Sequence, residues 1–127
     1  MFDCFMMNNE VDLVEVRLNL LSPIVEKFVI VESEFTHTGL KKPFHFLDNI
    51  DRFKPFSDKI IKLTYRESPP DHFDLSHKAW FNERGQRNLI LKALEYFKPA
   101  DGLMFISDAD EIAKPEKLLE AQELAIK

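Results

Sequence analysis

Short, almost wholly apolar segments alternate with stretches of helical pattern, and this alternation constrains the fold more than any other feature of the sequence. Residues 2–7, 28–31, 59–65 and 103–106 are predicted to be strands. The second and the fourth of these segments contain no polar residue. Such uninterrupted apolar runs are typical of strands that are buried on both faces. We therefore predict a single α/β domain over residues 1–127, with a mostly parallel sheet and flanking helices.

The segments between the predicted strands supply the helices. Apolar residues recur at helical spacing in residues 10–21, 79–97 and 116–126. An irregular segment is expected to form a short strand or turn near residues 44–47 and a short helix near residues 48–53. The residues of the first helix that are expected to face water are Glu10, Glu15, Arg17 and Asn19.

Charge and cysteine content exclude several classes of function. The net charge is −5, and Lys and Arg are dispersed among acids, so nucleic-acid binding is not expected. The single cysteine, Cys4, cannot form an internal disulfide and is expected to be a small core residue. No apolar run approaches the roughly 20 residues of a membrane span, so no membrane segment and a cytoplasmic location are expected.

The aromatic content is dominated by phenylalanine, with twelve Phe, two Tyr and one Trp. Phe has no polar group, so most of these rings are expected in the core. So many rings in a short chain also leave room for an exposed apolar patch, through which the chain could form a homo-oligomer.

Two aspartates, Asp108 and Asp110, follow the last predicted strand. In extended backbone, residues two apart project to the same side, so both carboxylates can approach one cation. Mg²⁺ and Mn²⁺ prefer oxygen ligands, and water or substrate phosphates complete their coordination. Because ligands of parallel α/β sheets bind beyond the carboxyl ends of the strands, this position favours a metal site. The alternative is that Asp108, Asp110 and Glu111 only turn the chain and stabilise the start of the next helix.

Several segments, taken in order, carry a resemblance to one family. They are residues 1–10 (MFDCFMMNNE), 28–33 (FVIVES), 86–88 (QRN) and 106–112 (ISDADEI). This ordered set resembles glycosyltransferase family 17. The resemblance implies a nucleotide-sugar transferase fold of GT-A type. It also implies transfer of N-acetylglucosamine from a UDP-sugar donor, UDP-N-acetylglucosamine, to a glycan acceptor.

The same resemblance implies roles for particular residues. Asp108 and Asp110 would be the D-x-D ligands of Mn²⁺ or Mg²⁺, which neutralises the leaving diphosphate. The residues at the ends of the first two strands, which would lie near the nucleoside, are Asn8, Glu10 and Glu32. Arg87 would contact phosphate.

The sequence ends one helix after the D-x-D motif, so we expect the donor-binding part of such an enzyme and assign no catalytic residue. Two alternatives stay open. Haloacid-dehalogenase-like phosphoryl-transfer enzymes also place D-x-D after a strand, but early in the chain and before Thr or Val, whereas Glu111 and Ile112 follow it here. The other alternative is a catalytically inactive binding or assembly domain.

Overall fold

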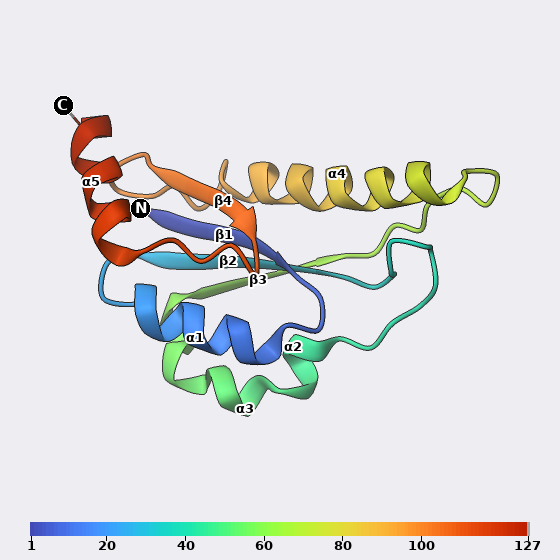
Figure 1. The fold of residues 1–127 in the computed structure, drawn as a ribbon, viewed down its shortest axis with the longest axis horizontal. Coiled ribbons are helices and arrows are strands. Elements are labelled where there is room, and N and C mark those ends of the chain that lie inside the picture. Colours follow the sequence, from blue (N-terminus) through green and yellow to red (C-terminus); the bar gives the residue numbers. More distant parts are fainter. Residues whose placement is uncertain (127) are drawn as a thin grey trace.

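Four parallel strands form one sheet in residues 1–126, the residues that the computed structural model describes (Figure 1). The order across the sheet is β3-β2-β1-β4, and each neighbouring pair is parallel. The bounds are Phe2–Met7 for β1, Lys27–Ser33 for β2, Ile60–Tyr65 for β3 and Met104–Asp108 for β4. The predicted α/β class with a parallel sheet is confirmed.

Helices cover both faces of the sheet. Figure 1 shows α1, α2 and α3 on one side and α4 along the other. The bounds are Val11–Leu21 for α1, His45–Asp48 for α2, Ile50–Phe53 for α3, Leu75–Ala93 for α4 and Pro115–Ile126 for α5, with a 3₁₀ helix at Lys54–Lys59. Within residues 1–126, none of these helices has the length and apolar character that a membrane crossing requires.

Alternate residues of the strands enter two separate apolar clusters, which explains why the strands carry apolar residues on both sides. Phe5 and Phe28 pack toward α1, in the cluster that also holds Val14 and Leu18. Cys4 and Val29, which adjoin these two residues in the strands, enter the other cluster together with Ile90 and Leu94 from the α4 side. The thiol of Cys4 is fully buried, which confirms its prediction as a core residue.

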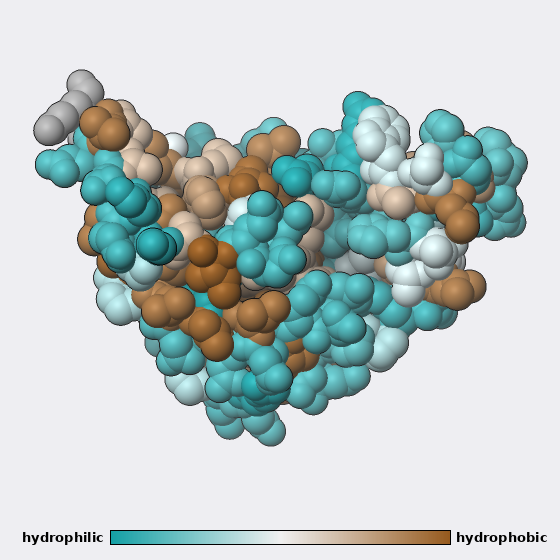
Figure 2. Space-filling model, viewed as in Figure 1, coloured by the Kyte–Doolittle hydropathy of each residue, from teal (hydrophilic) through white to brown (hydrophobic). Residues whose placement is uncertain are grey.

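The outer side of α1 differs from the prediction. Leu13, Val16 and Leu20 are 42–48% exposed, whereas Arg17 is fully buried. Figure 2 shows apolar side chains on the surface over the region where α1 lies in Figure 1. Phe97 is also half exposed, and homo-oligomer formation stays a prediction.

The predicted short strand or turn near residues 44–47 is wrong, because residues 45–48 form α2. The buried Glu32 carboxylate accepts the Phe46 N–H at 3.2 Å, which holds this turn of helix against β2. The short helix expected near residues 48–53 is present as α3.

The longest helix begins four residues earlier than predicted, at Leu75. The carboxylate of Asp74 accepts the His77 N–H at 2.8 Å and so caps the helix. An aspartate directly before Leu75 is the signal that would have located this start. The helix also ends earlier, at Ala93, and residues 94–96 form a turn.

Two strands extend beyond the predicted bounds. β2 continues through Glu32 and Ser33, because both pair with residues of β3. β4 continues to Asp108, which pairs with Met6 of β1. The first aspartate of the D-x-D motif is therefore the last residue of a strand, and Glu32 is inside one.

Candidate functional site

A pocket of about 270 Å³ opens at the carboxyl ends of β1 and β4. It brings together four residues that the sequence predicted: Asn8, Glu10, Asp108 and Asp110. The other polar residues of its wall, which sequence reasoning missed, are His37, Glu83 and Gln86. Adjacent parallel strands end at the same edge of a sheet, and this explains why residues 100 positions apart in the sequence meet here.

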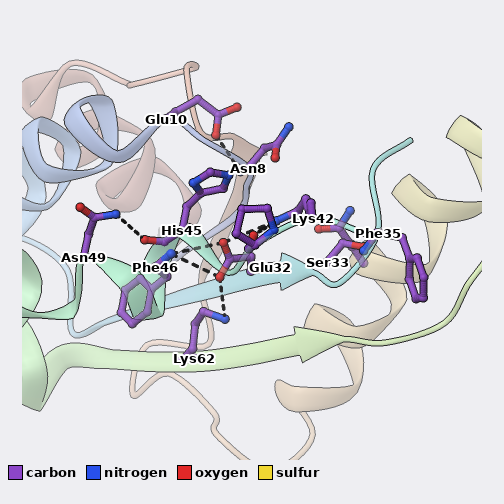
Figure 3. Close-up of polar contacts among 12 residues, drawn as sticks. Asn8, Glu10, Glu32, Ser33, Phe35, Lys42, His45, Phe46, Asn49 and Lys62 are labelled. Atoms are coloured by element: carbon purple, nitrogen blue, oxygen red, sulfur yellow. Dashed lines mark hydrogen bonds and ion pairs between the residues drawn. The ribbon is translucent and has the colours of Figure 1, made fainter. Parts of the chain in front are cut away.

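Asn8 and Glu10 belong to the turn between β1 and α1. The backbone N–H of Asn8 donates to Oε2 of Glu10 at 2.7 Å, so the Glu10 side chain folds back over the end of the strand (Figure 3). This hydrogen bond holds both residues at the pocket. The Asn8 side chain is exposed and can offer both a donor and an acceptor to a ligand.

Negative charge accumulates around Asp108. Burial raises the pKa of its carboxyl group above the usual value, and the carboxylates of Glu111, Glu83 and Asp110 raise it further, while Arg87 acts in the opposite direction. A cation bound here would relieve this repulsion, so the electrostatics of the pocket fit a positively charged ligand.

The donor atoms around the pocket fit a hard divalent cation. In the part of the chain that the structure describes, no three His, Cys, Asp or Glu side chains are gathered as a complete metal-binding group. Asp108 and Asp110 nevertheless offer carboxylate oxygens to the same pocket. Mg²⁺ keeps several waters and is bound in many enzymes through one or two carboxylates plus substrate phosphates. These two aspartates would therefore hold the ion incompletely, and a ligand would complete its coordination.

Arg17 lies beneath the D-x-D loop, although the sequence predicted that it faces water. Its side chain is fully buried and forms a two-pronged ion pair with Asp3, with Nε and Nη2 donating at 2.8 and 2.6 Å. The guanidinium carbon lies 4.2 Å from the centre of the Phe5 ring. Arg17 stands at helical spacing from the buried Val14 and Leu21, and this spacing is the signal that places it on the inner face.

The remaining N–H groups of Arg17 fix the loop itself. Nη1 donates to the Asp108 carbonyl oxygen at 2.7 Å and lies 3.3 Å from the carbonyl oxygen of Glu111. Nη2 also donates to Oγ of Ser107 at 2.6 Å. Within the loop, the Asp108 N–H donates to the Glu111 carboxylate at 2.9 Å. The backbone between the two aspartates is therefore held by a buried cation from below.

Glu32 does not line the pocket, although the sequence placed it at the end of a strand and near the nucleoside. It is fully buried, and its carboxylate lies 3.5 Å from the ammonium nitrogens of both Lys42 and Lys62 (Figure 3). Burial lowers the pKa of Lys62, and the charge of Glu32 opposes that shift. The structure shows Glu32 fixing the segment around Phe46 to the sheet; contact with a nucleoside stays untested.

Arg87 lies on α4, outside the wall of the pocket. Its Nη2 donates to Glu83 at 3.3 Å, one helical turn away, and both side chains are nearly half exposed. The positive charge of Arg87 lowers the pKa of Asp108, so the guanidinium lies within electrostatic range of the motif. An exposed pair of this kind is weak, and a ligand phosphate could replace Glu83 as the partner of Arg87.

Buried amides of α4 connect the pocket with β2. Gln86 donates through Nε2 to Oδ1 of Asn82 at 2.5 Å, and Asn82 donates to Oγ of Ser33 at 2.9 Å. Asn82 and Gln86 stand four residues apart, in line with the buried Ile90. This spacing is the signal that would have placed two polar residues on the inner face.

The fold and the site define a parallel α/β protein with an acidic pocket at the carboxyl edge of its sheet. The model of the family described as Glycosyltransferase family 17 matches residues 1–123, and the chain belongs to this family. No solved structure matches the chain significantly.

Three curated relatives carry the name beta-1,4-mannosyl-glycoprotein 4-beta-N-acetylglucosaminyltransferase. The human and the rat protein are 28% identical to the chain over 118 residues, and the mouse protein is 27% identical. Each alignment covers 88% of this chain and 21% of the relative. The chain thus spans about a fifth of the length of the curated relatives it matches.

Proposed function

We propose that this chain binds the donor of a metal-dependent glycosyltransferase of GT-A type, which transfers N-acetylglucosamine from UDP-N-acetylglucosamine to a glycan. The observation that carries the proposal is the pocket, where Asp108 and Asp110 meet Asn8 and Glu10 in a chain of family 17. The names of the relatives support N-acetylglucosamine as the sugar and a mannosyl-glycoprotein as the acceptor. The family match also favours sugar transfer over the phosphoryl-transfer alternative.

In this proposal Asp108 and Asp110 hold Mn²⁺ or Mg²⁺. When bound, the metal ion supplies positive charge that stabilises the departing diphosphate. Arg17 keeps the backbone between the two aspartates in position through the Asp108 and Glu111 carbonyls. Hydrogen-bonding groups and metal ligands that are already in position need no rearrangement when the UDP-sugar binds.

The side chains of Asn8 and Glu10 would hydrogen-bond the nucleoside from the end of β1. Arg87 would release Glu83 and bind a phosphate group, whose oxygens match the geometry of the planar guanidinium. Glu32 would act indirectly, by holding the segment around Phe46 against the sheet.

The charge of the pocket makes metal dependence a strict expectation. The carboxylates of Glu83, Asp110 and Glu111 all raise the pKa of Asp108, so an anionic diphosphate would be repelled without a cation. We expect calorimetry to show UDP binding with Mn²⁺ and none in the presence of EDTA. Absence of any affinity of this chain for UDP in saturating Mn²⁺ would refute the proposal.

Asp110→Asn tests the metal ligand. The side chain is exposed, so the melting temperature should stay unchanged while Mn²⁺-dependent UDP binding is lost. Asp71→Asn, at an exposed aspartate outside the pocket, is the matched control and should bind like the unmodified chain. Unchanged binding in Asp110→Asn would contradict the assignment, and an unfolded variant would show that Asp110 is structural.

A further inference from the structure

A second hollow, a groove of about 340 Å³, lies on the outer face of α4 beside the acidic pocket. Its wall consists of Trp80, Glu83, Arg84, Arg87, Asn88 and Leu91. Glu83 belongs to both hollows, so the groove adjoins the pocket. Figure 1 shows α4 along the outside of the molecule.

Trp80 is the central feature of the groove. It is the single tryptophan of the chain, and it is 56% exposed on a helix whose opposite face is buried. The guanidinium carbon of Arg84 lies 4.9 Å from the centre of its ring. A large ring left in water next to hydrogen-bonding groups is typical of a binding surface.

The polar groups around the ring indicate the chemistry of the ligand. Arg84 and Arg87 offer planar donors, Asn88 offers a donor and an acceptor, and Glu83 offers acceptors. Arg87 and Glu83 neutralise each other, so the net charge of the groove is the single positive charge of Arg84. A pyranose ring presents an apolar C–H face to an aromatic ring and hydroxyl groups at its rim, and this combination matches the groove.

We propose that this groove binds the acceptor glycan, a proposal that rests on the proposed function. Trp80 would stack on one sugar ring, while Arg84 and Asn88 would bind its hydroxyl groups. Trp80 and Glu83 are three residues apart, about 4.5 Å along the helix axis, which is less than the length of one sugar unit. The sugar next to the one on Trp80 would therefore reach the rim of the donor pocket, where an acceptor hydroxyl must meet the donor sugar.

The single tryptophan makes the groove directly observable. The full chain, with UDP and Mn²⁺ bound, is titrated with mannotriose while tryptophan fluorescence is recorded. We expect a saturable shift of the emission. Calorimetry should show that Trp80→Ala lowers the mannotriose affinity at least tenfold and that Arg84→Gln lowers it severalfold, both with unchanged UDP–Mn²⁺ affinity and melting temperature. Tyr96→Ala, at a residue that is 83% exposed outside the groove, is the matched control and should retain both affinities.

The outcomes separate the two proposals. Normal UDP–Mn²⁺ binding with no response of Trp80 to mannotriose, or with an unaffected Trp80→Ala variant, would overturn the glycan groove and leave donor binding intact. Absence of UDP–Mn²⁺ binding would overturn both. An emission shift that depends on protein concentration and needs no sugar would show that a second copy covers the groove, which would also overturn the proposal.

Discussion

Replacing Arg17 with methionine tests the buried ion pair directly. Arg17 and Asp3 are both fully buried, and Arg17 is the salt-bridge partner of Asp3. The substitution removes one charge and leaves a carboxylate without its counterion inside the protein. Breaking a buried pair in this way costs about 3–5 kcal/mol, against a total stability of about 5–15 kcal/mol for a typical domain.

The expected loss is large enough to measure in two ways. Urea unfolding followed by circular dichroism should show a free energy of unfolding lower by about 3–5 kcal/mol, with an unchanged slope. At roughly 3–5 °C per kcal/mol for a chain of this size, the melting temperature should fall by about 9–25 °C.

The double variant Asp3→Leu with Arg17→Met separates stability from function. It removes both charges, and with them the desolvation cost, so most of the stability should return. The carbonyl oxygens of Asp108 and Glu111 still lose the Arg17 donor and keep only the Glu111 N–H and the Ser107 hydroxyl, so the D-x-D loop loses its buried support. Calorimetry should therefore show weaker Mn²⁺-dependent UDP binding in a folded protein. A loss below 1 kcal/mol in Arg17→Met, or a double variant as unstable as the single one, would refute the reasoning.

Two further substitutions test the packing of the core. Gly85→Ala should destabilise the protein against urea, because the added Cβ would overlap the Tyr65 ring. Overpacking costs about 1–3 kcal/mol, whereas the higher helix propensity of alanine contributes about 1 kcal/mol. A more stable variant would contradict this expectation. Burial raises the pKa of the Cys4 thiol to about 12, with a smaller contribution from the charge of Asp3 and an opposing one from Arg17. Cys4 should therefore react with a thiol reagent at pH 8 only after the protein unfolds. Because the pKa of this thiol is higher in the folded than in the unfolded protein, its ionisation should lower the free energy of unfolding as the pH rises above about 8.5. Cys4→Ala should remove that pH dependence. A variant whose stability is equally sensitive to pH would show that other groups dominate.

Homo-oligomer formation is tested by light scattering of the full chain. The exposed Leu13, Val16 and Leu20 on α1 are the residues that such an interface would cover. A monomer at all concentrations would contradict the prediction.

The apolar pattern predicted the sheet because a strand covered on both faces can hold few polar residues. It therefore located four strands and their parallel arrangement, with ends displaced by one or two residues. It also predicted that Asp108 and Asp110 come to the carboxyl edge, where the structure gathers them with Asn8 and Glu10. These features follow from local sequence and from the way parallel strands align.

The polar residues inside the protein could not be located in this way. Glu32 was expected at a strand end, but pairing with β3 extends β2 and buries it between Lys42 and Lys62. Arg17 was expected in water, but a partner fourteen positions earlier and the end of β4 receive its hydrogen bonds. In each case the partners are distant in the sequence, and burial of a charge depends on whether they meet.

The sequence by itself thus determined the α/β class, the parallel strands and the acidic motif at the sheet edge, because periodicity and strand direction are local properties of the chain. The tertiary structure alone decided which charges are buried, which of them support the D-x-D loop, and that Trp80 lies beside the pocket through their shared neighbour Glu83. The physical reason is that a buried charge and a shared wall both require side chains from separate elements to come together, and only the packing of those elements brings them there.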